Sequence, residues 1–255
     1  MCNPAFRRAA GLLRLMLTCA LLLAAAAPAA AADRDRQRFV DVSVHTLWGG
    51  TYLINNFNSA FPEISHINTM MGVGIGAGAG VRLNITDLVA VGTELNLLVG
   101  HGKMDLAVAS ETNVSVSNVF QTNSYTQFII PVFVGFTLPV ADKVAWEIDP
   151  GFFIGLGLGG TQKSTIYDAK TNALGQLISS STVVEHDFYA DSDGFLSSVK
   201  RANFGFHLAT RLRFNSHFSI GLRTEIGLTN ASYSTGLVNP TIRPVNLLAE
   251  LGWRF

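Results

Sequence analysis

The chain has 255 residues, of which 48% are hydrophobic and only 14% are charged, and its 18 basic residues balance its 18 acidic ones. This balance gives no strongly basic surface of the kind that nucleic-acid binding needs, so we expect no nucleic-acid partner. After residue 32 no run of eighteen apolar residues occurs, which excludes an ordinary membrane-spanning helix there. A hydrophobic chain of this type is typical of a transmembrane β-barrel, because each strand of such a barrel is apolar on one face only.

Residues 1–32 have the three parts of a secretory signal peptide. Arginines lie near the start, an apolar run extends from Leu15 to Ala27, and small alanines precede the polar residues that begin at Asp33. The run is too short to cross a bilayer comfortably, although a retained anchor helix is the alternative. We therefore predict a cleaved signal peptide at 1–32 and one barrel domain at 33–255.

Loss of this signal peptide would change the charge and the cysteine content of the chain. Three of the 18 basic residues, Arg7, Arg8 and Arg14, lie in the signal peptide, and none of the 18 acidic residues does. The mature chain would therefore have 15 basic and 18 acidic residues, which gives a formal charge of −3. Both cysteines, Cys2 and Cys19, also lie there. The mature chain would then have no disulfide or thiolate chemistry, lipidation of Cys19 being the alternative.

Eight segments of the remaining chain alternate between apolar and other side chains, as strands with two different surroundings do. The clearest is 71–84, where apolar residues from Met71 to Leu83 alternate with five glycines, Arg82 and Asn84. Alternating glycines would destabilise a helix, whereas on the inner face of a narrow barrel they leave room for large side chains. In chain order, the predicted strands are 39–48, 71–84, 88–100, 125–138, 144–160, 201–214, 218–228 and 244–255.

The connections between these strands alternate between long and short. Long loops are predicted at 49–69, 101–124, 161–200 and 229–243, and short turns at 84–87, 139–143 and 215–217. Outer-membrane barrels have this asymmetry, with short periplasmic turns and long outer loops. We predict an all-β fold, an eight-stranded antiparallel up-and-down transmembrane β-barrel in the bacterial outer membrane. The loops at 101–124 and 161–200 are long enough to hold a hairpin each, which would give ten or twelve strands.

Aromatic side chains are predicted to gather at the two rims of this barrel, as they do at membrane interfaces. The periplasmic belt would comprise Phe39, Phe136, Trp146, Phe214, Phe218, Trp253 and Phe255, and the outer belt Trp48, Tyr125 and Phe204.

The faces that we assign to the barrel interior carry acidic and basic residues in equal numbers. The predicted network comprises Arg82, Glu94, Glu147, Asp149, Arg211, Arg213, Arg223, Glu225, Glu250 and Arg254. Buried charges must pair, and an eight-stranded barrel is just wide enough to be filled by side chains. We therefore predict an interior plugged by salt bridges. A narrow path for water or ions, through voids left by the glycines, is the alternative.

Residues that could carry catalysis or bind a metal show no defined spacing. His45 and His207 are predicted to face inward as hydrogen-bonded fillers, and no serine has a G-x-S-x-G context. Asp191, Asp193 and Gly194 resemble half of a calcium loop, but the glutamate that would complete it is missing. We therefore expect no enzymatic activity, no cofactor and no metal, a weak surface cation site being the alternative.

Three stretches resemble the outer membrane protein beta-barrel family, which includes PorT-like proteins, and more distantly the OmpA/OmpX-type small barrels. They are the glycine-rich segment 72–84, the turn and strand at 84–96, and the terminal Leu251-Gly252-Trp253-Arg254-Phe255. The resemblance covers about 39–255. It implies that the barrel-assembly machinery reads Trp253 and Phe255 as an assembly signal.

Together these features lead us to expect an integral outer-membrane protein with a structural or interaction role. Its partners would be outer-membrane lipid and, through its outer loops, envelope or extracellular proteins. One alternative is a component of a secretion or transport assembly, which the PorT-like resemblance suggests. Another is an enzyme that modifies outer-membrane lipid.

Overall fold

The computed structural model describes residues 39–56, 64–67, 70–110, 115–171, 176–189, 199–215, 217–232 and 241–255. The predicted signal peptide at 1–32, with both cysteines, lies outside these ranges. The strands are β1 (Val40–Asn56), β2 (Ile64–Ile67), β3 (Met70–Asn84), β4 (Val89–Ser110), β5 (Ser115–Ala141), β6 (Val144–Thr171), β7 (Leu177–Asp187), β8 (Ala202–Phe214), β9 (Phe218–Gly227) and β10 (Thr241–Arg254). Within the described ranges, no helix is long and apolar enough to cross a membrane.

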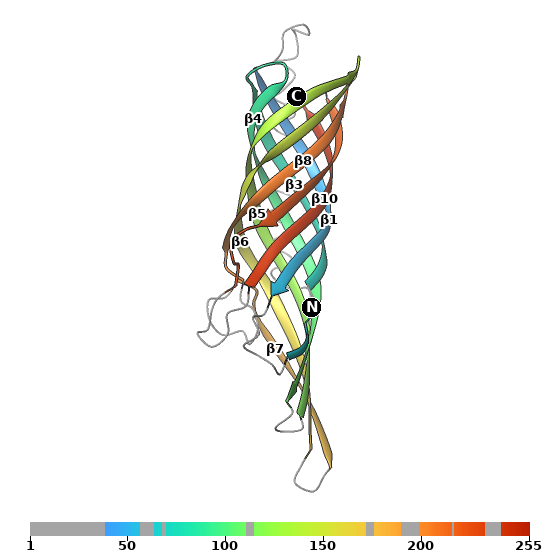
Figure 1. Cartoon of the computed structure of the whole chain (residues 1–255), viewed down its shortest axis with the longest axis vertical. Helices are drawn as coiled ribbons and strands as arrows, with labels where there is room; N and C mark the ends of the chain where they lie inside the picture. The colour runs from blue at the N-terminus through green and yellow to red at the C-terminus, as the bar shows by residue number, and fades with distance from the viewer. Residues whose placement is uncertain are drawn as a thin grey trace, which may run out of the picture.

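Eight of the ten strands close into an antiparallel ring (Figure 1). Around the ring the order is β1, β3, β4, β5, β6, β8, β9 and β10, and β10 pairs with β1 to close it. The predicted eight-stranded up-and-down barrel is therefore confirmed. Closure leaves no unpaired strand edge in the ring, as a structure surrounded by lipid requires.

The strands of the ring are staggered along its axis. Following the paired residues once around from Asp41 leads through the other seven strands and back to β1 at Thr51, ten residues farther along. Such a stagger requires the strands to tilt against the barrel axis, and Figure 1 shows this tilt. Residues paired across neighbouring strands therefore lie at slightly different heights in the membrane.

Three strands continue far beyond the ring, where we predicted loops. β4, β5 and β6 have 22, 27 and 28 residues, whereas β8 and β9 have 13 and 10. β2 pairs with the outer part of β4 and β7 with that of β6, so neither belongs to the ring (Figure 1). The segments predicted as loops at 101–124 and 161–200 are therefore mostly strand, and each forms a hairpin as our alternative allowed, yet the ring still has eight strands.

The sequence pattern explains why the outermost strand, β7, is hard to recognise. Every side chain of β7 is exposed or half-buried, on both faces of the strand. With no buried face, a strand loses the strict apolar alternation from which we predicted the others. β1 also extends to Asn56 and β10 begins at Thr241, inside segments that were predicted as loops, and both extensions do have a buried face, with Leu53 and Ile242 pointing into the mouth.

Within the ring, the predicted alternation corresponds to an outer and an inner face. On β3, Met71, Val73 and Ile75 point outward and are exposed, whereas Arg82 points inward and is buried. The apolar face of the barrel is thus directed to lipid. Leu97 differs from its neighbours on this face, because its register places it beside Ala77 and Phe128 on the outer face and yet it is fully buried.

Tyr125 departs from its predicted place in the outer aromatic belt. Its side chain is buried in the barrel mouth, where its ring stacks on that of Phe188 at 4.8 Å between centroids. Gly100 on the neighbouring strand allows this, because a Cβ atom at Gly100 would collide with the Tyr125 ring. The inward rotamer gives the aromatic ring a packed partner instead of a place at the lipid interface.

Side chains fill the interior in three successive clusters. Nearest the short turns lie the charged residues. An apolar cluster follows, formed by Leu47, Leu98, Ile129, Phe153 and Leu248. A second apolar cluster closes the outer mouth and comprises Leu53, Met70, Met104, Tyr125, Phe188, Tyr189, Val199, Ala231 and Ile242.

Candidate functional site

All ten charged residues that we predicted for the interior point into the barrel. They come from six strands: β3, β4, β6, β8, β9 and β10. Eight of them are at most 6% exposed, namely Arg82, Glu94, Glu147, Asp149, Arg211, Arg223, Glu225 and Glu250. Arg213 and Arg254, nearest the periplasmic rim, are half-buried.

Arg211 lies at the centre of this network. Its Nε donates to Glu250 at 2.6 Å, its Nη1 donates to Asp149, and its Nη2 donates to Glu94 at 2.6 Å. One guanidinium from β8 therefore joins carboxylates from β10, β6 and β4. Arg223 adds a second bridge, since its Nη2 lies 2.5 Å from Glu94 and 2.7 Å from Glu250.

A second group of ion pairs lies closer to the periplasmic rim. Glu147 accepts from Arg213 at 2.8 Å and from Arg254 at 2.6 Å. Arg82 donates to Asp149 at 2.7 Å, which connects this group to the central one. Asp41 joins the group through Arg254 at 3.3 Å. Asp41 was not among the predicted network residues, although its place on the alternating face of β1 would have identified it.

Glu225 and the two histidines, His45 and His207, have fewer hydrogen-bond and ion-pair partners than the rest of the interior. Glu225 accepts a hydrogen bond from Asn246 at 2.9 Å and lies 3.8 Å from His207 Nδ1, but among the described residues it has no arginine partner in an ion pair. His45 is hydrogen-bonded to Asn96 at 2.6 Å, as predicted for a filler. His207 is not, because neither of its ring nitrogens has a hydrogen-bond partner within the part of the chain that the structure describes.

The cost of burying these charges explains their dense pairing. Moving an isolated ion out of water costs several kcal/mol even after relaxation, and only well-placed partners offset that cost. Each carboxylate in the centre contacts one or two guanidinium groups at hydrogen-bonding distance. Arginine suits this arrangement because its fork of five N–H donors can serve several carboxylates at once.

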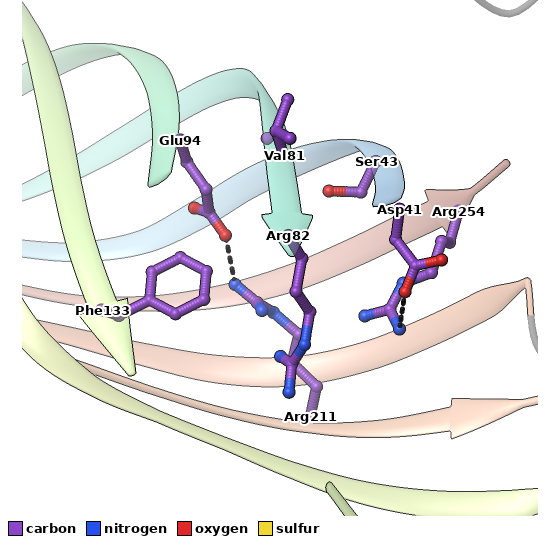
Figure 2. A pocket seen from close by; sticks show the side chains of 9 residues that line it. Asp41, Ser43, Val81, Arg82, Glu94, Phe133, Arg211 and Arg254 are labelled. Atoms are coloured by element: carbon purple, nitrogen blue, oxygen red, sulfur yellow. Dashed lines mark hydrogen bonds and ion pairs between the residues drawn. The ribbon is translucent and has the colours of Figure 1, made fainter. Parts of the chain in front are cut away.

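A small cavity lies at the periplasmic side of the network (Figure 2). Its volume is about 10 Å³, and its lining includes Asp41, Arg82, Glu94, Arg211 and Arg254. Figure 2 shows the two ion pairs that border it, Glu94 with Arg211 and Asp41 with Arg254. A cavity of this size holds about one water molecule, so the arrangement can hold a water molecule but has no room for a larger ligand.

The outer mouth contains contacts that our sequence reasoning did not find. Phe188 and Tyr189, just after β7, are buried with their rings nearly perpendicular, 4.9 Å between centroids. Gly157 and Gly160 of β6 make room for them, because a Cβ at either position would collide with these two residues. Asp187 holds the turn, accepting from the Tyr189 backbone N–H at 3.0 Å and pairing with Arg201 at 3.3 Å.

Possible metal ligands are scattered over the described part of the chain. Among the described residues, no group of three His, Cys, Asp or Glu side chains is arranged to hold a metal ion. Asp191, Asp193 and Gly194 lie outside those residues.

The two predicted assembly-signal residues lie where β10 closes the ring. Trp253 points outward and is 48% exposed, between Val44 of β1 and Phe218 of β9. The Phe255 N–H donates to the Val42 carbonyl at 2.9 Å, which continues the β1–β10 pairing to the end of the chain.

Replacement of Arg211 tests the importance of the central network. In Arg211→Met, Glu94, Asp149 and Glu250 lose a shared partner, and loss of one member of a buried pair typically costs about 3–5 kcal/mol. We expect the free energy of unfolding to fall by at least that amount, measured by urea unfolding in lipid vesicles with tryptophan fluorescence. Arg213→Met is the control, because Arg213 contacts Glu147 and is 20% exposed, and should cost clearly less. Equal losses in the two variants would contradict a central role for Arg211.

One family model and several solved structures are similar to this chain. The family model described as "Outer membrane protein beta-barrel domain" matches residues 17–255. Ail, the attachment invasion locus protein of Yersinia pestis, in complex with the heparin analogue sucrose octasulfate, is 10% identical over 86% of this chain and 100% of that chain, with a TM-score of 0.35. Neisserial surface protein A is 10% identical over 86% of this chain and 98% of that chain, with a TM-score of 0.30.

A third solved structure, the N-terminal beta-barrel domain of Pseudomonas aeruginosa OprF, is 10% identical over 84% of this chain and 97% of that chain, with a TM-score of 0.24. No curated protein sequence matches the chain. Because the family model covers nearly the whole sequence, the chain belongs to the outer membrane protein beta-barrel domain family and is an integral protein of the bacterial outer membrane.

Proposed function

We propose that this protein is a closed structural and interaction barrel that contacts envelope or extracellular proteins through its outer hairpins. The observation that carries the proposal is the continuation of β4, β5 and β6 beyond the ring, with β7 paired to β6 (Figure 1). These strands form a sheet that stands outside the membrane. Ordered hairpins hold their contact groups in fixed positions, which lowers the entropy cost of binding a partner.

β7 supplies the surface that is best suited to a protein partner. Leu177, Ile178 and Val183 are all more than half exposed. Among the described strands β7 pairs only with β6, so its other edge presents backbone N–H and C=O groups without a strand partner. An extended segment of another protein can add to such an edge as a further strand, which makes backbone hydrogen bonds the source of affinity.

The filled interior favours this role over a transport channel. The apolar cluster that includes Leu47, Phe153 and Leu248 follows directly on the charged network, and its members are at most 3% exposed. Ions crossing this cluster would lose their hydration without gaining polar partners. The ion pairs below it would also have to separate.

We further propose a non-enzymatic role and an ordinary export route. Residues 1–32 would be cleaved as a signal peptide, and the barrel-assembly machinery would then read Trp253 and Phe255. Trp253 is exposed on the closing strand and Phe255 is half-buried just after it.

Photo-crosslinking tests the outer sheet as an interaction surface. We expect a benzoylphenylalanine at Val183 to crosslink proteins in native membranes, because this side chain is 58% exposed on β7. The same group at Ile220, which is 47% exposed on the membrane face of the ring, should give none of these adducts. Identical adducts at both positions, or none at Val183, would overturn the interaction role.

Planar-bilayer recording tests the closed interior. We expect the purified barrel to show no stable conductance above that of the bare bilayer, because buried side chains fill its cross-section. A variant with smaller side chains in the apolar cluster, Phe153→Ala with Leu248→Ala, should raise the frequency of brief openings. A steady open channel in the unmodified protein would show that the interior conducts.

Deletion of Phe255 tests the assembly signal. We expect the amount of folded barrel in the outer membrane to fall severalfold, measured by heat-modifiable migration on gels. Phe39→Ala is the matched control, because Phe39 is also an exposed aromatic residue at the periplasmic rim. Normal levels after the deletion would mean that the terminal aromatic residue is not read.

A further inference from the structure

The outward face of β4, β5 and β6 continues without a break from the membrane zone into the outer sheet. In the membrane zone it carries exposed or half-buried apolar side chains such as Leu95, Ile130 and Leu156. Farther out, the same face turns polar at His101 and Ser124, whose side chains are hydrogen-bonded at 2.8 Å. One continuous surface therefore passes from hydrocarbon to the level of the lipid headgroups.

The first charged side chains beyond the apolar zone are basic. Lys103 on β4 lies opposite Thr122 on β5, which in turn lies opposite Lys163 on β6. Neighbouring strands are 4.7–4.9 Å apart, so the two lysine backbones are about 10 Å apart on one face. Both side chains are exposed, and within the described part of the chain neither forms an ion pair with an acid.

The acidic residues of this region do not all lie beyond the lysines, because Asp187 lies opposite Thr161, one same-face position nearer the membrane than Lys163, where it pairs with Arg201 at 3.3 Å. Asp105 follows Lys103 on β4 in the outward direction, and Glu185 lies opposite Lys163 on β7, one strand farther around. On β10, leaving the apolar zone past Val245, the first charged residue is again basic, Arg243. With Asp187 paired to Arg201, the lysines and Arg243 still outnumber the one remaining acid at this level, Glu185, so the potential there is positive.

An exposed aromatic pair lies beyond the lysines. Phe120 on β5 and Tyr167 on β6 are 52% and 49% exposed, and their rings meet edge to face at 5.8 Å between centroids. Both stand on the outward face, in line with Thr122 and Lys163 on their own strands. Aromatic rings exposed in pairs are costly in water, and the apolar C–H faces of sugar rings cover such surfaces well.

We propose that this face of β4, β5 and β6 binds a phosphorylated glycolipid of the outer leaflet. Its acyl chains lie against the apolar zone, a phosphate group lies between Lys103 and Lys163, and sugar rings cover Phe120 and Tyr167. Compact ammonium groups suit phosphate as point charges, and long lysine side chains reach along the surface toward the headgroup. This inference goes beyond the proposed protein-interaction role and does not depend on it.

Lipid binding to the purified full-length barrel in detergent tests the proposal, with native mass spectrometry as the readout. The probe is bisphosphorylated lipid A, compared with its dephosphorylated form, with phosphatidylglycerol and with inorganic phosphate. We expect the double variant Lys103→Gln, Lys163→Gln to bind lipid A roughly tenfold or more weakly, because each lysine near a charged lipid surface contributes about fivefold in affinity. Its binding of the dephosphorylated lipid should not change.

Two further variants separate the contribution of the aromatic pair from that of the two lysines. Phe120→Ser with Tyr167→Ser should weaken lipid A binding and leave phosphatidylglycerol binding unchanged, because only lipid A carries sugar rings. Lys143→Gln, an exposed lysine at a periplasmic turn, is the control and should bind like the unmodified protein. Heat-modifiable migration verifies that each variant is folded.

Three outcomes would overturn the glycolipid site. One is unchanged lipid A binding in the folded double-lysine variant. Another is equal affinity for the bisphosphorylated and dephosphorylated lipids. The third is full competition by inorganic phosphate at the lipid's own concentration, which would indicate a simple anion site.

Discussion

The pairing of Arg211 with three buried carboxylates is the interaction on which the rest of the barrel depends. Glu94, Asp149 and Glu250 come from strands far apart in sequence, and one guanidinium from β8 joins them. A slip of one residue in any of these strands would turn its carboxylate toward lipid and an apolar side chain inward. The charged network therefore makes the native register of these strands much lower in free energy than registers shifted by one residue. Closure of the ring by β1 and β10 is fixed in the same way, because Glu250 lies on the closing strand.

The size of the ring then determines what the protein can do. Eight strands enclose a space that side chains fill, and here glycines on β3 and β6 leave just enough room for aromatic and charged groups from the opposite wall. At Gly78, for example, a Cβ atom would collide with Asn96 and lie 2.6 Å from His45 Nε2. Among the described residues, the cavity beside the charged network has room for about one water molecule, which supports the proposed closed interior. Recognition is left to the outer surface.

The sequence predicts the membrane part of this fold well and the outer part poorly, for a physical reason. Inside the membrane, lipid on one side and a packed interior on the other impose strict alternation, so strand positions, inward charges and the eight-stranded ring all follow from the pattern. Outside it, both faces of β7 meet water, and segments that form strands look like polar loops. Tyr125 was misplaced because its aromatic character suggested the belt, although alternation places it on the same inward face as Gln127 and Ile129. The burial of Leu97 depends on packing around it, which alternation does not give. The hydrogen bonds of His207 and the partners of Glu225 depend on distances that no sequence pattern contains.

The outer sheet and the barrel cannot be treated as separate parts, because the same strands build both. β5 and β6 run uninterrupted from the periplasmic turn to the tip of the hairpins, so the outer sheet is held by the barrel's own hydrogen bonds rather than by a linker. The aromatic cluster of Tyr125, Phe188 and Tyr189 packs at the point where the ring ends. There the three rings bury one another's apolar surface, which neither lipid nor the opposite wall of the barrel could cover. This cluster fixes the base of the hairpins. It follows that the orientation of β7 and of the lysine-bearing face is set by the ring itself, and that both surfaces are presented at a constant height above the membrane.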